Sequence, residues 1–432
     1  MNNSVTYFPS GEGAGKNMVV KTEKEKIAMS RDKPGVCVLV GAYYPIVGGG
    51  ETHSRQLCSA LVERGFPLFV LTRRYTAELK SFEVIDGVPV YRVWSGGMKR
   101  WGKYLMMFPA LFYLIRMRKE YDVIYVSVFR ALGILGVIAA KLLGKKCVLR
   151  AGVSGEMTGN SMLEEYQEKK PVSYFFLTLF IPLRNTVLRK ADRFISISRE
   201  VREDFLAAGI AEEKIIHIPN GVDTDKYHPV TKATQSRLRG TLNLPDGRLF
   251  CYSGKLNQGK GLELVVRVWP EVIKQYPDAS VVFIGGGANQ FLSFESKLRE
   301  EVRQRGLDEV IMFTGYVSNV ADYLQACDYF LFPSESEGMP NALLEAVACG
   351  LPAVATRIGG NTDIINDDQL GYLIPVGDEQ ALLKSVLALL QDSAKAEAMG
   401  RAMRLRIEEL FALDVMLGSY AEMFSGIDIK RV

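Results

Sequence analysis

Two glutamates, Glu337 and Glu345, could do chemistry in this sequence, and seven residues lie between them. The apolar segment 329–332 before them is typical of a buried strand, and Pro340 favours the first turn of a helix. Glu337 is therefore expected in a loop, where its carboxylate could hydrogen-bond a sugar or stabilise positive charge. Glu345 is expected one to two turns inside the helix, where it could accept hydrogen bonds from ribose hydroxyls. Each could instead be an ordinary solvated acid, so the pair alone is weak support for a site.

The backbone around this helix start could hold an anion. N–H groups in the first turn of a helix have no partner within it and carry partial positive charge, so those near residues 339–342 could bind a diphosphate. A second apolar segment, 249–252, precedes the glycine loop 254–261, which contains Lys255 and Lys260. Lysines on such a loop suit an anion as point charges, although they could also be exposed loop residues without a ligand.

Strands that alternate with helices would position these residues. In the first half, five apolar segments separated by helical patterns are typical of buried strands: 36–40, 68–71, 122–126, 146–149 and 194–197. The pattern restarts in the second half, with segments 249–252, 280–284, 310–313, 329–332 and 353–355. This order predicts an α/β protein with two doubly wound parallel sheets, and ligands bind such sheets at the carboxyl ends of the strands.

The turn-rich segment 218–221 marks the boundary between the two halves. We expect a flexible leader at 1–33, a first domain at 34–215 and a second domain at 216–394. Residues 1–200 contain 30 Lys+Arg against 17 Asp+Glu, whereas residues 201–432 contain 23 against 32. The first domain is therefore basic and the second acidic, and the basic one is expected to face an anionic partner.

The sequence offers little for a metal or disulfide site. Its six cysteines and three histidines are scattered, without a CxxC pair, which is typical of small buried side chains in a reducing compartment. Asp223 and Asp225 are similar to the Asp-x-Asp metal motif of some sugar transferases. In a segment between domains, however, such carboxylates more readily cap the following turn.

Two apolar segments, 104–115 and 172–183, are each 12 residues long and have basic flanks. Both are too short to span a bilayer, which needs about 20 residues. One interpretation is a buried helix of the first domain. The other is a basic, apolar helix that lies on an anionic membrane surface, and the positive charge of this half is compatible with it.

Taken in order, five motifs resemble family 4 of the glycosyltransferases, which are retaining enzymes with the GT-B fold. The motifs are 48–51, 191–192 with 195–198, 218–223, 254–261, and the 337–345 pair with its continuation to 359–360. The resemblance covers roughly residues 34–425. It implies two Rossmann-like domains that face each other across a cleft, the first binding the acceptor and the second the nucleotide sugar. It also implies that a C-terminal helix, about 395–425, crosses back onto the first domain.

The resemblance implies roles for individual residues. Lys260, with Lys255 in the place usually held by arginine, would bind the donor diphosphate, and Glu345 would hold the ribose. Glu337 would contact the transferred sugar, so Glu337 and Lys260 are the expected catalytic residues. The expected donor-binding residues are Gly49, Gly50, Lys255, Lys260, Tyr316, Val317, Gly338, Met339, Asn341, Ala342 and Glu345.

The implied chemistry is transfer of a hexose-type sugar from a nucleotide-diphosphate sugar to a membrane-lipid or cell-surface glycan, as in polysaccharide biosynthesis. Charge on the leaving diphosphate would be stabilised by the lysines and the helix start. No metal, cofactor or nucleic acid is expected, and the location would be cytoplasmic or at the inner face of the membrane. The alternatives are a nucleotide-sugar epimerase on the same fold, a transferase with a small soluble acceptor, and a non-catalytic protein that binds sugar nucleotides.

The chain departs from the family pattern in two places. Many relatives have a histidine after the strand that corresponds to 146–149, whereas residues 150–156 contain none. Arg150, Ser154 and Glu156 are expected on the acceptor side instead. Lys255 also lacks the two-pronged hydrogen bonding of an arginine, which weakens the expected phosphate contact at that position.

Overall fold

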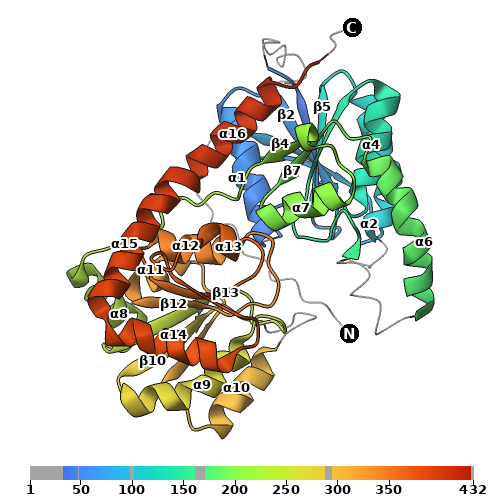
Figure 1. The fold of residues 1–432 in the computed structure, drawn as a ribbon. Coiled ribbons are helices and arrows are strands. Elements are labelled where there is room, and N and C mark those ends of the chain that lie inside the picture. The colour runs from blue at the N-terminus through green and yellow to red at the C-terminus, as the bar shows by residue number, and fades with distance from the viewer. Residues whose placement is uncertain (1–32, 47, 98–101, 161–170, 288–293, 430–432) are drawn as a thin grey trace.

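The computed structural model describes residues 33–46, 48–97, 102–160, 171–287 and 294–429. These residues form two α/β domains, each built on its own sheet (Figure 1). The predicted fold class is confirmed. Apart from Lys33, the expected leader at 1–33 lies outside the described residues.

Within these ranges, the N-terminal sheet has eight strands in the order β3-β4-β2-β1-β5-β6-β7-β8. The strands are β1 Val36–Leu39, β2 Leu68–Arg73, β3 Phe82–Ile85, β4 Val88–Val93, β5 Val123–Ser127, β6 Lys146–Arg150, β7 Arg193–Ser196 and β8 Ile215–His217. Neighbours pair in parallel, except that β3 and β4 are antiparallel. The helices are α1 Gly49–Glu63, α2 Gly102–Leu105, α3 Met107–Arg116, α4 Leu132–Leu143, α6 Pro171–Leu188 and α7 Arg199–Ala207, with a 3₁₀ turn at Glu212–Lys214.

The C-terminal sheet has six strands among the described residues, all parallel, in the order β11-β10-β9-β12-β13-β14. The strands are β9 Arg248–Ser253, β10 Ala279–Ile284, β11 Ile311–Gly315, β12 Tyr329–Phe332, β13 Ala353–Thr356 and β14 Tyr372–Ile374. The helices are α8 Lys232–Leu242, α9 Leu262–Gln275, α10 Glu295–Gln304, α11 Val320–Ala326, α12 Asn341–Ala348, α13 Asn361–Ile364 and α14 Glu379–Gln391.

The chain ends in two helices, α15 Ser393–Leu410 and α16 Leu413–Ser425, which leave the C-terminal domain and return to the N-terminal one (Figure 1). At the crossing point Val222 pairs with this segment, since its N–H donates to the Phe411 carbonyl and its own carbonyl accepts from Leu413, both at 2.8 Å. Helix α16 packs on α1, and the ring of Phe424 in α16 meets that of Phe66, between α1 and β2, edge to face. The two domains are thus tied together by the segment around Val222 and by α16.

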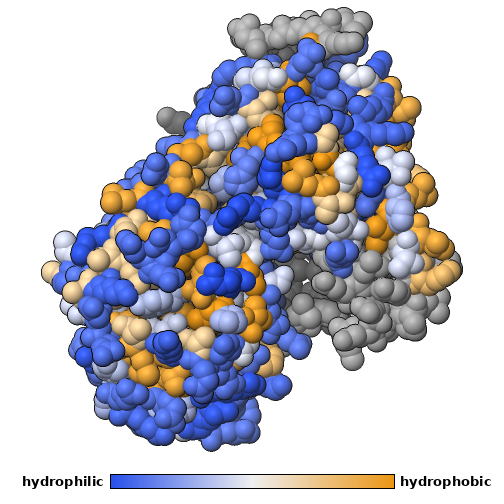
Figure 2. All heavy atoms as spheres, in the orientation of Figure 1, coloured by the Kyte–Doolittle hydropathy of each residue, from blue (hydrophilic) through white to orange (hydrophobic). Residues whose placement is uncertain are grey.

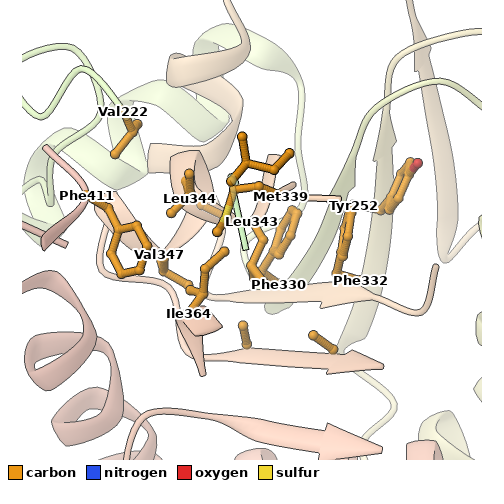
Figure 3. Close-up of a cluster of buried hydrophobic side chains, with 14 of the residues drawn as sticks. Val222, Tyr252, Phe330, Phe332, Met339, Leu343, Leu344, Val347, Ile364 and Phe411 are labelled. Carbon is orange, nitrogen blue, oxygen red and sulfur yellow. The ribbon is translucent and has the colours of Figure 1, made fainter. Parts of the chain in front are cut away.

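Helix α12 is fixed by an apolar cluster beneath it (Figure 3). Leu343 and Val347 of α12 are buried, as are Phe330 and Phe332 of the neighbouring β12. Truncating one such core side chain typically costs about 2–5 kcal/mol. This packing leaves the start of α12 fixed at the carboxyl end of β12.

The strand order directs two loops toward one point of the C-terminal sheet. Strand β9 lies between β10 and β12, so the chain leaves β9 toward β10 on one side and leaves β12 toward β13 on the other. The helices after β9 and β12 therefore lie on opposite faces of the sheet, and the two loops diverge between these strands. In open α/β sheets such a switch point is where ligands bind. The loops that follow β9 and β12 are 254–261 and 333–340, which contain the predicted lysines and Glu337.

Candidate active site

The predicted catalytic residues, Lys260 and Glu337, meet at this switch point. The Lys260 Nζ atom lies 2.5 Å from Glu337 Oε1, and their side chains are 26% and 19% exposed. The loops can approach this closely because Gly261 lacks a side chain: a Cβ there would lie 2.1 Å from the Pro333 carbonyl oxygen. Gly261 also has a φ of +64°, which favours glycine.

The Glu337 carboxylate is held by more than the lysine. The Ser334 hydroxyl donates to Glu337 Oε1 at 3.0 Å, and Ser334 is fully buried. Thr356 at the end of β13 donates to the Ser334 carbonyl, and the Glu335 N–H donates to the Gly259 carbonyl at 2.9 Å. The two loops are therefore connected by hydrogen bonds, which orients Glu337 toward a defined position.

Two helix N-termini, one from each domain, meet beside this pair. Helix α12 starts at Asn341 after Pro340, helix α1 starts at Gly49 after Gly48, and no described side chain caps either one. A Cβ on Gly49 would lie 3.5 Å from Asn341 Nδ2, so the two starts are close together. First-turn N–H groups carry partial positive charge, and their convergence forms a site suited to a diphosphate.

The remaining residues at the start of α12 support this geometry. Met339 is buried and Ala342 is half-buried, whereas Gly50 on α1 is exposed. Gly338 lies against the N-terminal domain: a Cβ there would be 2.3 Å from the Gly152 carbonyl oxygen. Any larger residue at 338 would separate the domains at this point.

Glu345 lies one turn inside α12, where it is partly buried against the segment between the domains. Burial raises its pKa to about 7, while the nearby Lys226 ammonium and a hydrogen bond with the Tyr227 hydroxyl act in the opposite direction. The carboxyl group can therefore gain or lose a proton near neutral pH. That matters for its predicted contact with ribose hydroxyls, because an ionised carboxylate is the stronger acceptor.

The other predicted donor-binding residues lie on the loops that follow β9 and β11. A Cβ on Gly285 would lie 2.1 Å from the Gly254 carbonyl oxygen, so the loops after β9 and β10 touch through their backbones. Tyr316 follows β11 at the same edge and is 64% exposed, Val317 next to it is half-buried, and Lys255 is exposed. Tyr316 and Val317 therefore lie at the same edge of the sheet as the glycine loop with Lys255.

Of the three residues predicted on the acceptor side, Ser154 faces a cavity. It lines a space of about 550 Å³ between the domains together with Arg199 and Glu337. Glu156 is fully buried instead, and its carboxylate accepts hydrogen bonds from the N–H groups of Arg130 and Gly152 at 3.1 and 2.8 Å. Glu156 thus holds the loop that presents Ser154.

Arg150 is also buried, and it connects the domains through a residue that had no predicted role. Its guanidinium donates to Asn220 Oδ1 at 2.7 Å. The amide of Asn220 donates in turn to the Met339 carbonyl at 3.1 Å and to Asn341 Oδ1 at 2.9 Å. Asn220 lies in the Pro-Asn-Gly turn from which the domain boundary was predicted. That turn was the sequence signal that could have pointed to Asn220.

A second contact between domains was not predicted. Asp363 in α13 accepts hydrogen bonds from the Arg199 N–H at 2.7 Å and from Arg199 Nε at 2.5 Å. Arg199 is the first residue of α7, so a carboxylate from one domain lies at the helix start of the other. Residues 164 positions apart form this contact, and no local pattern indicates it.

The Asp-x-Asp segment caps a turn, as the sequence suggested. Asp223 Oδ1 accepts hydrogen bonds from the N–H groups of Asp225 and Lys226 at 3.1 and 2.9 Å. In the part of the chain that the structure describes, no group of three or more His, Cys, Asp or Glu side chains could hold a metal ion.

Comparison with known proteins identifies both halves of the chain. Residues 47–226 match the family model of Glycosyltransferase Family 4, and residues 247–392 match that of Glycosyl transferases group 1. A GDP-mannose-dependent alpha-(1-6)-phosphatidylinositol monomannoside mannosyltransferase of Mycolicibacterium smegmatis is 28% identical over 319 residues, 69% of this chain and 76% of the relative. A D-inositol 3-phosphate glycosyltransferase of Kineococcus radiotolerans is 26% identical over 378 residues, 82% of this chain and 85% of the relative.

The fold is shared with solved structures. HepE of Anabaena, solved in complex with UDP, superposes with a TM-score of 0.74 at 18% identity, covering 91% of this chain and 100% of HepE. At that identity the likeness concerns the fold alone. The predicted family and fold are confirmed: this chain belongs to glycosyltransferase family 4, has the GT-B fold, and is a glycosyltransferase that uses nucleotide sugars.

Proposed function

We propose that this enzyme is a metal-independent, retaining hexosyltransferase that uses a nucleotide-diphosphate sugar and needs no cofactor. One observation carries the proposal: the Lys260–Glu337 pair lies where two uncapped helix starts meet at the domain interface. This arrangement offers positive charge for a diphosphate beside a carboxylate for the sugar.

Cleavage of the anomeric C–O bond transfers negative charge to the leaving diphosphate. The Lys260 ammonium and the N–H groups at the start of α12 are positioned to stabilise that charge, which is usually the largest catalytic contribution. In the structure Lys260 pairs with Glu337 at 2.5 Å, so a bound diphosphate would take the place of the Glu337 carboxylate as the anionic partner of Lys260. Glu337 would then be available to stabilise the positive charge that develops on the sugar.

Retention follows if the acceptor attacks from the face that the diphosphate leaves. The acceptor oxygen forms the new bond to the anomeric carbon as the old C–O bond breaks, and its proton passes to an oxygen of the leaving phosphate. The cavity lined by Ser154 and Glu337 supports this path, because it gives an acceptor access beside the donor site.

The proposed acceptor is a membrane lipid or a surface glycan, met at the inner face of the cytoplasmic membrane. Support comes from the Mycolicibacterium relative, whose name specifies a phosphatidylinositol monomannoside as its substrate. The charge of the N-terminal half points the same way, with 30 basic against 17 acidic residues in positions 1–200. Basic surfaces are attracted to anionic lipids.

The first test is a thermal-shift screen with UDP, GDP, ADP and their sugars in the presence of EDTA. A ligand that binds the native state raises the unfolding midpoint by mass action. We expect one nucleotide series to do so without metal. If the midpoint shifts only after Mg²⁺ or Mn²⁺ is added, the result contradicts metal independence.

The second test measures turnover of Lys260→Ala with the matching donor. We expect kcat to fall by about 10²–10³-fold, the usual loss when one group that stabilises developing charge is removed. Lys274→Ala is the control, because Lys274 is an exposed lysine paired with Glu271 on the surface of α9. A fully active Lys260→Ala variant would refute the proposed role. Proton NMR of the product should show the anomeric configuration of the donor, and inversion would refute retention.

A further inference from the structure

Three neighbouring helices of the N-terminal domain expose large apolar side chains. Helix α3 packs against α4, and α4 packs against α6. The exposed residues, with their exposed fractions, are Phe108 79%, Phe112 59% and Ile115 45% on α3, Ile138 42% and Leu142 75% on α4, and Phe175 61%, Leu179 61%, Phe180 43% and Leu183 67% on α6. We call this set the α3/α4/α6 face. Figure 2 shows hydrophobic residues along the edge of the domain where Figure 1 places α4 and α6.

The spacing shows that these residues form stripes. Phe108, Phe112 and Ile115 recur at intervals of four and three, and on α6 Phe175, Leu179 and Leu183 recur at intervals of four. Such spacing places side chains on one side of a helix. The opposite side of α3 is used for packing, since Ala110 and Leu114 are fully buried. The exposed stripes are therefore additional to the residues that the fold itself requires.

The helices of the α3/α4/α6 face have basic residues at one end, where the exposed Glu120 also lies. None of the three helices contains Asp or Glu. Each helix precedes a parallel strand, so the C-terminal ends of all three lie at the same edge of the sheet. Exposed cations follow there, including Arg116, Lys119 and Lys190. Large aromatic and aliphatic side chains with nearby cations suit an anionic lipid surface.

The opposite ends of these helices lie at the carboxyl edge of the sheet, where the loop with Ser154 lines the cavity between the domains. A bilayer against the α3/α4/α6 face would therefore lie next to the acceptor side of the cleft. None of the described helices is long and apolar enough to cross a membrane. The contact would thus be with the bilayer surface.

We propose that the α3/α4/α6 face docks onto the surface of an anionic phospholipid bilayer and so presents the cleft to a lipid-linked acceptor. This inference rests on the proposed function and specifies its membrane partner and the docking residues. A second copy of the chain fits less well, because α3, α4 and α6 contain no Asp or Glu that could pair with the exposed cations of another copy. An anionic bilayer supplies that counter-charge.

The test measures binding of the full chain to sedimented vesicles of phosphatidylcholine, with or without 30% phosphatidylglycerol. We expect binding to the anionic vesicles that weakens as salt rises, because the attraction is screened. The apolar variant carries Phe108→Glu, Leu142→Glu and Phe175→Glu, and the basic variant carries Arg116→Glu, Lys119→Glu and Lys190→Glu. The basic variant should reduce binding by roughly 100-fold, because one basic residue near an anionic surface contributes about fivefold. The apolar variant should also weaken binding strongly, because it replaces three large apolar side chains with carboxylates that an anionic surface repels.

A matched control places the same substitution elsewhere: Val376→Glu, Leu405→Glu and Val415→Glu alter three exposed apolar residues outside this face. The control should bind vesicles as the unmodified protein does. Equal binding by all variants, or no preference for anionic vesicles, would overturn the inference. The inference would also be overturned if the protein did not bind vesicles but self-associated, and the apolar variant abolished that self-association. A nucleotide-induced thermal shift that persists in such a case would leave the proposed transferase function intact.

Discussion

The raised pKa of Glu345 predicts an unusual pH dependence of stability. Burial raises this pKa from 4.5 to about 7 in the folded chain, whereas the unfolded chain should titrate near the ordinary value of about 4.3. Between these values the folded state holds a proton that the unfolded state has lost. Stability therefore falls as pH rises from about 4.5 to about 7, and the loss is complete above that range.

The magnitude follows from the size of the shift. One pKa unit corresponds to about 1.4 kcal/mol, and the partial exposure of Glu345 reduces the full product to about 2–3 kcal/mol. The substitution Glu345→Gln keeps the shape and removes the charge. Its unfolding midpoint relative to the unmodified protein should be higher by only about 1–3 °C at pH 5 and by roughly 5–10 °C at pH 8.5, given about 2–4 °C per kcal/mol for a domain of this size.

The assay is a thermal unfolding series from pH 5 to pH 8.5 on both proteins. Glu422→Gln is the control, because Glu422 is an exposed glutamate on α16, and its midpoint difference should not vary with pH. A constant difference for Glu345→Gln as well would mean that Glu345 is ionised throughout, and the reasoning from burial would be refuted.

The same group should couple donor binding to pH. If the ionised carboxylate accepts hydrogen bonds from ribose hydroxyls, donor binding releases a proton below pH 7. Affinity should then fall up to about tenfold for each unit below that value. In Glu345→Gln the profile should be flat and the affinity lower at pH 8. Isothermal titration with the matching nucleotide measures both effects, and identical profiles for the two proteins would contradict the ribose contact.

Two further predictions concern the contact between the domains. In Gly338→Ala the new Cβ would lie 2.3 Å from the Gly152 carbonyl oxygen. Steady-state assays should therefore show kcat reduced by about 10²-fold, because misplacing a reacting group by about 1 Å has an effect of that size. Unchanged turnover would show that the domains do not close at this point. Replacing Asn220 removes an acceptor of the buried Arg150 guanidinium, so Asn220→Ala should lower the free energy of unfolding by about 1.5–3 kcal/mol in denaturant titrations. Asn220→Asp keeps that acceptor but loses the amide donor to Met339, so it should retain more stability yet lose turnover, and full activity would contradict a positioning role.

Local sequence patterns determined much of the fold. Buried parallel strands are short apolar segments, and glycine-rich loops follow them, so the alternation was visible without tertiary information. The strands β9, β10 and β12 were predicted within one or two residues, and α12 begins one residue after the predicted Pro340. The strands β3, β4, β8 and β14 were not predicted. The antiparallel β3, for example, lies at the edge of the sheet with an alternating, partly exposed pattern.

The sequence also indicated the type of site, because lysines and a helix start suit an anion wherever they meet. It could not bring together Lys260 and Glu337, which are 77 positions apart and meet only through the order of the strands. Nor could it distinguish Ser154, which faces the cavity, from the buried Glu156 two residues later.

Exposure was decided only by the tertiary structure. The apolar segments 104–115 and 172–183 were compatible with either a buried or a surface helix. In the structure, the described side chains of α3 and α6 include large apolar residues that are exposed. The pKa of Glu345 likewise depends on the segment between the domains that packs against it. Hydrophobicity and charge belong to a residue, whereas burial depends on what the rest of the chain places beside it, and that is settled by contacts distant in sequence.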